Sequence, residues 1–131
     1  MLGKAKGGAS TIDMQFVRTA TGYKEKTLRR KWYEMLLAVL IQYRYSKPQI
    51  LRSYLDCAFF GSGLVGAHQA SLRMFSGAPG ELTSDSAAQV AAMLVYPRPL
   101  RPEAHWIEKI QQRGRYGLAR LERSKERFEK L

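Results

Sequence analysis

The sequence predicts an all-α fold of about six helices. Apolar residues recur at helical spacing in several segments, capping patterns precede most of these segments, and prolines or glycines separate them. No segment shows a convincing strand pattern, and no internal repeat is visible. With 131 residues and 45% hydrophobic content, the chain has the size and the apolar content of a single domain.

The N-terminal part of the sequence leads into a first helix. Residues 1–8 are rich in Lys and Gly and are expected to be a flexible lead. Ser10 or Thr11 would cap a helix that begins at Ile12, because a hydroxyl oxygen can accept a hydrogen bond from a free N–H group of the first turn. Such an end can bind an anion, although a plain cap without a ligand accounts for the same pattern.

A long helix is predicted from Leu28 to Tyr45, with Thr27 as its cap. Its centre, Met35–Ile41, consists of seven consecutive apolar residues and leaves no polar face for two turns. This helix is therefore expected to be buried on nearly all sides. Its Trp and Tyr side chains are assigned to the core rather than to a ligand cage.

One carboxylate, Glu34, stands directly before this apolar run. Arg30 and Lys31 lie four and three residues earlier, on the same face of the helix. Opposite charges at this spacing attract each other and favour the ionised carboxylate. A charged Glu beside cations at the wall of a cleft predicts a site for a phosphate or a sugar.

The following segment predicts a helix from Lys47 to about Ala58. Ser46 and Gln49 form the capping-box pattern, and a proline is tolerated in the first turn because its missing N–H would have no partner there. The single cysteine excludes an internal disulfide, and its apolar surroundings predict a packed rather than a reactive thiol.

Three glycines, at positions 61, 63 and 66, come next among large apolar residues. They are expected to turn the backbone tightly or to let it approach a ligand or another segment closely. The nucleotide-binding P-loop pattern is not found. A short helix is predicted from Ala67 to Phe75; its His68 has no second His or Cys at ligand spacing, so no metal ligand is assigned.

Two more helices complete the predicted fold. The first opens with the hydroxyl and acidic residues of Thr83–Asp85 and continues through Ala87–Val95. Prolines at 97, 99 and 102 predict an extended crossing segment, after which Glu103 starts the last helix. Residues 122–131 form a charged tail. The apolar side of the last helix would carry Trp106, Ile110, Tyr116 or Gly117, and Leu121.

The charge of the chain points to an anionic partner. Twenty-two Lys and Arg residues against 11 Asp and Glu residues give a formal net charge of +11. Nucleic acid, a phospholipid surface and a phosphorylated substrate all suit this charge. No apolar run approaches the roughly 20 residues that span a bilayer, and no signal core is seen at the N-terminus, so a soluble or peripheral protein is expected.

Four segments together resemble one family. They are GGASTIDMQ (7–15), RRKWYE (29–34), YSKPQILRSYLDCAFFGSGLVGAHQAS (45–71) and LTSDSAAQVAAMLVYPRPLRP (82–102). In order and spacing they are similar to motifs of the peptidoglycan glycosyltransferases, glycosyltransferase family 51, found in bifunctional penicillin-binding proteins and monofunctional cell-wall transglycosylases. The resemblance covers about residues 7–121 and implies a lysozyme-like helical domain.

The resemblance also implies a substrate and a reaction. The family acts on lipid II, a lipid-linked disaccharide. It joins the sugar 4-hydroxyl of one molecule to the anomeric carbon of a growing glycan chain and releases undecaprenyl pyrophosphate. Pyrophosphate and anionic lipid would both account for the excess of Lys and Arg. The implied location is the outer, periplasmic face of the bacterial cytoplasmic membrane, with peripheral contact through residues such as Phe16 and Arg18.

Site residues follow from the family's motifs, position by position. Glu34 matches the second acidic residue of the active site, which orients substrate and manages charge near the leaving pyrophosphate. A divalent metal ion such as Mg²⁺ or Mn²⁺ could share this task, and no residue is assigned as its ligand. The implied substrate-binding residues are Ser10, Thr11, Gln15, Arg18, Lys26, Arg30 and Lys31. The implied supports of the cleft are Lys47, Tyr54 and Leu55.

The sequence departs from the family at several positions. Asp13, Met14 and Asp56 replace other residues, and Asp13 would add unfavourable charge beside a pyrophosphate site. The family's first motif, E-D-x-x-F-x-x-H-x-G, which carries the glutamate assigned as general base, is not found in this sequence. We therefore expect an N-terminally truncated, partial glycosyltransferase domain, and whether it is an active enzyme by itself stays open.

Three interpretations remain at this point. In the first, another chain or an upstream segment supplies the missing part of the domain. In the second, the chain is a non-catalytic remnant that still binds lipid pyrophosphate. In the third, it is a basic helical nucleic-acid-binding module, for which neither a helix-turn-helix nor a basic-zipper pattern is seen. Nucleic acid is therefore not the expected partner.

Overall fold

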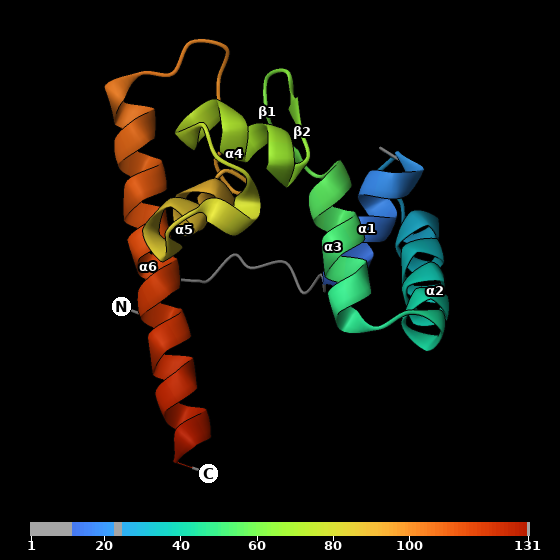
Figure 1. Cartoon of the computed structure of the whole chain (residues 1–131). Helices are drawn as coiled ribbons and strands as arrows, with labels where there is room; N and C mark the ends of the chain where they lie inside the picture. The colour runs from blue at the N-terminus through green and yellow to red at the C-terminus, as the bar shows by residue number, and fades with distance from the viewer. Residues whose placement is uncertain (1–11, 23–24, 131) are drawn as a thin grey trace, which may run out of the picture. The chain divides into compact units, whose positions relative to one another are not determined.

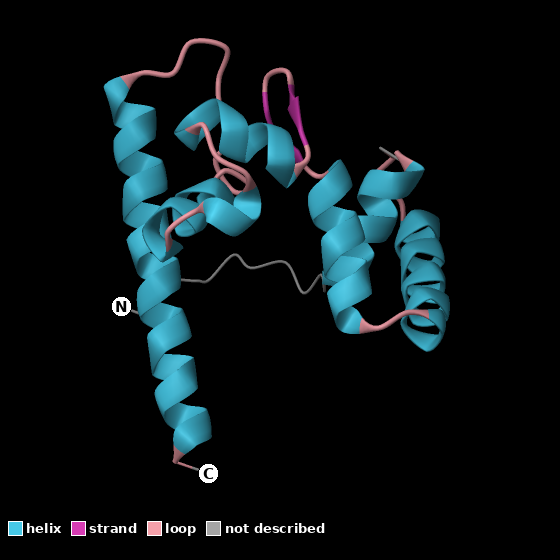
Figure 2. Cartoon of the chain, viewed as in Figure 1, coloured by secondary structure: helices cyan, strands magenta, loops and turns pink. Residues whose placement is uncertain are grey.

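The structure is a computed structural model, in which residues 12–22 and 25–130 are described (Figure 1). The predicted lead 1–8 and the predicted cap residues Ser10 and Thr11 lie outside the described residues. The described part contains six α-helices, one short 3₁₀ turn and one two-stranded hairpin (Figure 2). This composition confirms the predicted all-α class. The chain divides into two compact units, the first ending at Leu55 and the second starting at Asp56.

The described part of the first unit contains three helices. Their bounds are Ile12–Thr21 for α1, Leu28–Arg44 for α2 and Lys47–Cys57 for α3, whose last two residues belong to the second unit. α1 packs on α2 through Met14, Val17 and Ala38, with Leu37 and Ile41 partly buried against them. This small apolar core holds the two helices side by side.

α2 begins where the sequence predicts, but its burial differs. The Thr27 Oγ1 atom accepts a hydrogen bond from the Arg30 N–H at 3.2 Å and caps the helix. Burial on nearly all sides is wrong: only Glu34 and Ala38 are buried on α2, and the Trp32 side chain, expected in the core, is 72% exposed. α1 packs against one side of α2. An apolar sequence by itself does not bury a helix, because burial requires another element to pack against each side.

α3 also follows the prediction closely. The Ser46 N–H donates to Gln49 Oε1 at 2.9 Å, which is one half of a capping box. The Ser46 hydroxyl donates to the same oxygen instead of capping the helix itself. Ile50 and Tyr54 are buried. Burial raises the pKa of the Cys57 thiol, in keeping with a packed and unreactive side chain.

The described part of the second unit combines a hairpin with three α-helices and a 3₁₀ turn, whose course can be followed in Figure 1. The elements are β1 (Phe59–Gly61), β2 (Leu64–Val65), α4 (Ala67–Phe75), the 3₁₀ turn η1 (Pro79–Glu81), α5 (Ser84–Ala92) and α6 (Ala104–Glu129). β1 and β2 pair antiparallel. The sequence prediction missed this hairpin because the strands are too short to show an alternating pattern. Thr83 caps α5, as predicted, by accepting from the Ser86 N–H at 3.2 Å.

The glycine-rich hairpin approaches the proline segment closely. Arg98 donates its N–H to the Phe60 carbonyl at 2.8 Å, and its own carbonyl accepts from the Ser62 N–H at 2.9 Å. Gly61 lies between these two bonds with φ +143°, and a Cβ there would come within 2.4 Å of the Arg98 backbone. Of the two predicted uses of glycine, close approach to another segment is therefore the one seen at this position.

We expect Gly61→Ala to lower the free energy of unfolding of the second unit by about 3 kcal/mol, because the new methyl group clashes with backbone atoms that cannot rotate away. Gly63→Ala is the matched control: Gly63 has φ +72° and open space around it, so only backbone strain of about 1 kcal/mol applies. Urea unfolding measures both, followed by tryptophan fluorescence in a Trp32→Phe background in which Trp106 is the single tryptophan. Equal losses in the two variants would contradict the proposed close contact.

α5 and α6 pack closely over a limited length. A Cβ at Gly114 would lie 3.2 Å from the backbone at Ala88, so glycine permits the approach of the two helices. Trp106 and Ile110 are buried, as predicted, but Tyr116 and Leu121 are more than half exposed. The predicted apolar side of α6 therefore ends earlier than expected, because α5 is only nine residues long.

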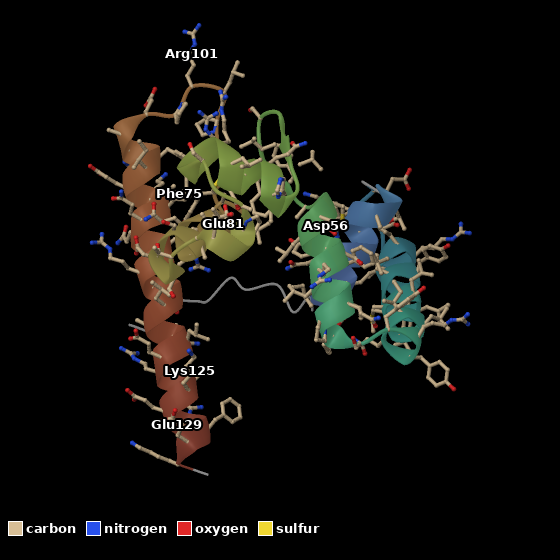
Figure 3. All side chains as sticks on the ribbon, in the orientation of Figure 1. Asp56, Phe75, Glu81, Arg101, Lys125 and Glu129 are labelled. Carbon is tan, nitrogen blue, oxygen red and sulfur yellow. The ribbon has the colours of Figure 1, made fainter. Side chains whose placement is uncertain are left out.

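The C-terminal half of α6 extends past the helices of its own unit. Figure 3 shows Lys125 and Glu129 pointing outward from it. Residues 119–130 are all exposed, in keeping with their mixed charge. Within residues 12–22 and 25–130, no helix combines the length and the apolar character that crossing a bilayer requires.

Candidate functional site

A buried carboxylate joins α1 to α2 in the first unit. Glu34 is only 1% exposed. The Arg18 guanidinium on α1 donates to both of its oxygens, from Nε to Oε1 at 3.2 Å and from Nη2 to Oε2 at 3.0 Å. Arg30, one turn earlier on α2, places its Nε 3.2 Å from Glu34 Oε1. Two cations thus surround one anion.

The two arginines contribute differently. The Arg18 pair is a two-pronged, charge-assisted interaction, the strongest geometry available to a guanidinium and a carboxylate. The Arg30 Nε–H is not aligned for a hydrogen bond to Glu34, so its attraction is Coulombic. The Arg18 hydrogen bonds hold the pKa of Glu34 below its ordinary value of 4.5; burial acts in the opposite direction, and the charges of Arg18 and Arg30 assist. Glu34 is therefore an anion at neutral pH.

Arg18 remains accessible although its partner is not. Its side chain is 43% exposed, whereas that of Glu34 is 2% exposed. A guanidinium carries five N–H groups, and Glu34 takes only two of them. The remaining N–H groups can meet an anion from solvent. The cluster of two cations and one carboxylate keeps one excess positive charge for this purpose.

The structure brings together only some of the predicted site residues. Arg18, Arg30 and Glu34 form the cluster. Lys31 is exposed and makes no ion pair within the described part of the chain, so the predicted Lys31–Glu34 attraction is not realised as a contact. Four further residues predicted at the site lie elsewhere in the first unit or outside the described residues. They are Gln15, exposed on α1, Lys26, exposed just before α2, and the two undescribed cap residues.

A cavity of about 880 Å³ lies beside the cluster at the N-terminal end of α2. Arg30 belongs to both, because it lines the cavity and contacts Glu34. The other lining residues are Thr21, Glu25, Thr27, Arg29, Trp32, Tyr33 and Leu36. Sequence reasoning assigned Trp32 and Tyr33 to the core, and only their exposure in the structure reveals them as cavity walls.

A second buried carboxylate links all three helices of the first unit. Asp13 is fully buried, and its Oδ2 accepts from Gln42 Nε2 at 2.5 Å and from Lys47 Nζ at 3.0 Å. Burial raises the pKa of Asp13, but the hydrogen bonds from Lys47 and Gln42 and the charge of Lys47 together hold it below 3.8. Asp13 was expected to place unfavourable charge near the ligand. In the structure it is buried, and its negative charge pairs with Lys47 inside the first unit.

Within this network Lys47 ties α3 to α1, and its role as a support of the substrate cleft stays a prediction. Tyr54 is buried and Leu55 half-buried in the same helix. A metal ion, by contrast, does not fit the Glu34 cluster. Both Glu34 oxygens face guanidinium groups, and the described residues gather no group of three or more His, Cys, Asp or Glu side chains that could hold one.

Comparison with known proteins agrees on one family. A family model described as Transglycosylase matches residues 1–122. Penicillin-binding protein 2a of Streptococcus pneumoniae serotype 2 is 40% identical over 96 residues, which is 73% of this chain and 13% of that protein. Penicillin-binding protein 1A of Rickettsia felis is 36% identical over 114 residues, 87% of this chain and 14% of the relative.

A shorter relative is covered more fully. The Biosynthetic peptidoglycan transglycosylase of Thiobacillus denitrificans is 33% identical over 111 residues, 85% of this chain and 47% of that protein. The chain thus spans less than half the length of each of these curated relatives. Because the family model covers nearly all of the sequence, and because these relatives are more than 30% identical over most of this chain, the chain belongs to the transglycosylase family.

Proposed function

We propose that this chain forms the part of a peptidoglycan glycosyltransferase domain that binds the pyrophosphate of lipid II. The observation that carries the proposal is the pairing of Arg18 with Glu34, which fixes a half-exposed guanidinium by means of a buried carboxylate. A guanidinium held in this way recognises phosphate oxygens without losing side-chain freedom on binding.

The chemistry of the reaction explains the value of such a group. The 4-hydroxyl of one sugar attacks the anomeric carbon of the other substrate, the bond from that carbon to the pyrophosphate oxygen breaks, and negative charge develops on the departing undecaprenyl pyrophosphate. Positioned cations stabilise this developing charge without having to reorganise during the reaction. Arg18 would contact the pyrophosphate directly, Arg30 would add positive charge beside it, and Lys26 remains a further candidate for the same anion.

Glu34 has a positioning role in this proposal. Its two oxygens are occupied by guanidinium N–H groups and it is nearly inaccessible to solvent, so it is poorly placed to accept a proton from a sugar hydroxyl. Its negative charge instead aligns Arg18. The proton of the attacking hydroxyl would go to a general base supplied by another part of the glycosyltransferase domain, on this chain or on a partner chain at the periplasmic face of the membrane.

Binding of a pyrophosphate lipid tests the proposal. We expect Arg18→Ala to weaken binding of undecaprenyl pyrophosphate by about tenfold or more, because a charge-assisted contact to phosphate is lost. Binding of undecaprenol, which lacks the phosphates, should not change. Arg52→Ala is the matched control, since Arg52 is an exposed cation on α3 of the same unit. Calorimetry or surface plasmon resonance with detergent-dispersed lipid gives both affinities.

Equal losses for Arg18→Ala and Arg52→Ala would mean that only the overall positive charge matters, and would overturn the assignment. Polymerisation of labelled lipid II separates catalysis from binding. Glycan strands made by this chain would support an enzyme, whereas binding of the pyrophosphate lipid without synthesis would support a domain that only binds it.

A further inference from the structure

The cavity at the N-terminal end of α2 has features that pyrophosphate binding does not use. Its volume of about 880 Å³ falls within the range of small-molecule sites, and every residue that lines it belongs to the first unit. Pyrophosphate is far smaller than this space. The cavity therefore has room for a bulkier group next to the anion-binding cluster.

Two adjacent aromatic side chains and Leu36 form the apolar part of the cavity. Trp32 is 72% exposed and Tyr33 57% exposed. Trp106, the other tryptophan of the sequence, is 9% exposed and donates its indole N–H to the Tyr96 carbonyl at 3.0 Å. Trp106 thus shows how a core tryptophan is used in this chain. Trp32, by contrast, is largely exposed, so its side chain is available to a ligand.

Polar and charged groups surround these aromatic rings. Arg29 and Arg30 offer guanidinium donors, Thr27 a hydroxyl and Glu25 a carboxylate acceptor. A bare anion would pair with the arginines but would leave the rings unused and would be repelled by Glu25. A lipid chain would pack on the rings but would leave these charged groups without partners.

A hexopyranose ring can contact both the aromatic and the polar residues that line the cavity. One face of the ring presents C–H groups, which pack against the electron-rich face of an aromatic side chain, and its rim presents hydroxyls that both donate and accept hydrogen bonds. The cavity also adjoins the Glu34 cluster, because Arg30 lines it and places its Nε 3.2 Å from Glu34 Oε1. A sugar in the cavity would be one side chain away from the cluster that holds Arg18.

We propose that this cavity is a glycan-binding subsite in which Trp32 and Tyr33 stack on hexopyranose rings while Arg29, Thr27 and Glu25 bind their hydroxyl groups. The proposal rests on the proposed function, because it identifies this sugar with the glycan part of the transglycosylase substrate. It adds a surface for the carbohydrate that shares Arg30 with the Glu34 cluster but otherwise consists of different residues. Trp32 and Tyr33 become the residues that distinguish a sugar from other ligands.

Titration with chitotetraose, a soluble N-acetylglucosamine tetramer, tests the subsite. Binding to the unaltered chain should change the fluorescence of exposed Trp32 and give a measurable heat by calorimetry. Trp32→Ala should weaken the affinity by at least about tenfold, whereas Trp32→Phe, which keeps an aromatic face, should stay within about threefold. Tyr43→Ala is the matched control, because Tyr43 is a 92% exposed aromatic residue on the same helix that does not line the cavity.

The subsite is overturned if chitotetraose does not bind, if Trp32→Ala binds it as tightly as the unaltered chain, or if Tyr43→Ala causes the same loss. Inorganic pyrophosphate provides a second check: a similar loss of pyrophosphate binding in Trp32→Ala would make the cavity an anion site. Helical circular dichroism of each variant shows that the fold is retained.

Two ligands separate this proposal from the proposed function. Chitotetraose binding that is sensitive to Trp32, in a chain that fails to bind undecaprenyl pyrophosphate, would uphold the subsite and reject the proposed function. Binding of undecaprenyl pyrophosphate without chitotetraose binding that depends on Trp32 would uphold the proposed function and reject the subsite.

Discussion

Replacing Glu34 by glutamine is expected to abolish any glycan polymerisation that the unaltered chain shows with labelled lipid II, while the helical circular dichroism spectrum is retained. Glutamine has nearly the same shape, but its amide NH₂ would face an Arg18 N–H group and repel it. Arg18 would then lose the two-pronged contact that fixes its guanidinium. Losing a positioned transition-state cation costs about 100-fold or more in rate, so the synthesis of strands should fall below detection.

Binding of undecaprenyl pyrophosphate gives a second measurement of the same effect. Glu34→Gln should weaken it, although by less than Arg18→Ala, because the guanidinium is still present but is no longer aligned. Glu108→Gln on α6 is a charge-matched control in the second unit and should alter neither property. Full polymerisation by Glu34→Gln, or stronger binding of the pyrophosphate lipid, would rule out the positioning role of this carboxylate.

Lys47→Met is expected to lower the free energy of unfolding of the first unit by about 3 kcal/mol, and by more than Asp13→Ala does. Asp13 is fully buried, and its Oδ1 already has no hydrogen-bond partner among the described residues. Removing Lys47 therefore leaves the buried negative charge of Asp13 without its cation. Removing Asp13 instead leaves a lysine side chain that is 70% exposed and readily hydrated. The double variant should resemble Asp13→Ala alone. Thermal and urea unfolding of the unaltered chain, the two single variants and the double variant gives the double-mutant cycle that measures the coupling of Asp13 and Lys47.

The pH dependence of the same variants provides the control. The folded-state pKa of Asp13 lies below 3.8, so its stabilising contribution is complete at neutral pH and is lost as the pH falls below 3.8 through that lowered pKa. In Lys47→Met the burial of Asp13 is no longer opposed by the lysine charge, so its pKa should rise and acidification should reduce the penalty of the substitution. A penalty that grows on acidification would contradict this account of the network.

The features that could be predicted from the sequence are those fixed by neighbours along the chain. Thr27 as a cap, the start of α3 after Ser46 and the attraction between Arg30 and Glu34 all depend on residues three or four positions apart. The Arg18–Glu34 pair joins residues 16 positions apart on different helices, and its geometry could not be read from spacing. The family resemblance supplied Arg18 as a candidate but not its partner.

Burial was the least predictable property of the site. The apolar run of α2 predicted a surrounded helix, yet burial depends on how many neighbouring elements pack against it, and in the first unit α1 packs along only one side. The exposure of Trp32 follows from this difference and is the basis of the cavity. Asp13 shows the opposite case: a charged residue that looked misplaced is buried, because Gln42 and Lys47 reach it from two other helices.

The contact between the hairpin and Arg98 places unequal limits on sequence variation. Both of its hydrogen bonds use main-chain atoms of Arg98, so any residue with a backbone N–H can replace this arginine without losing them. Proline, which already stands on both sides of it at positions 97 and 99, would remove the donor. In homologous chains that keep this contact, position 98 should therefore vary freely but exclude proline, while position 61 should remain glycine.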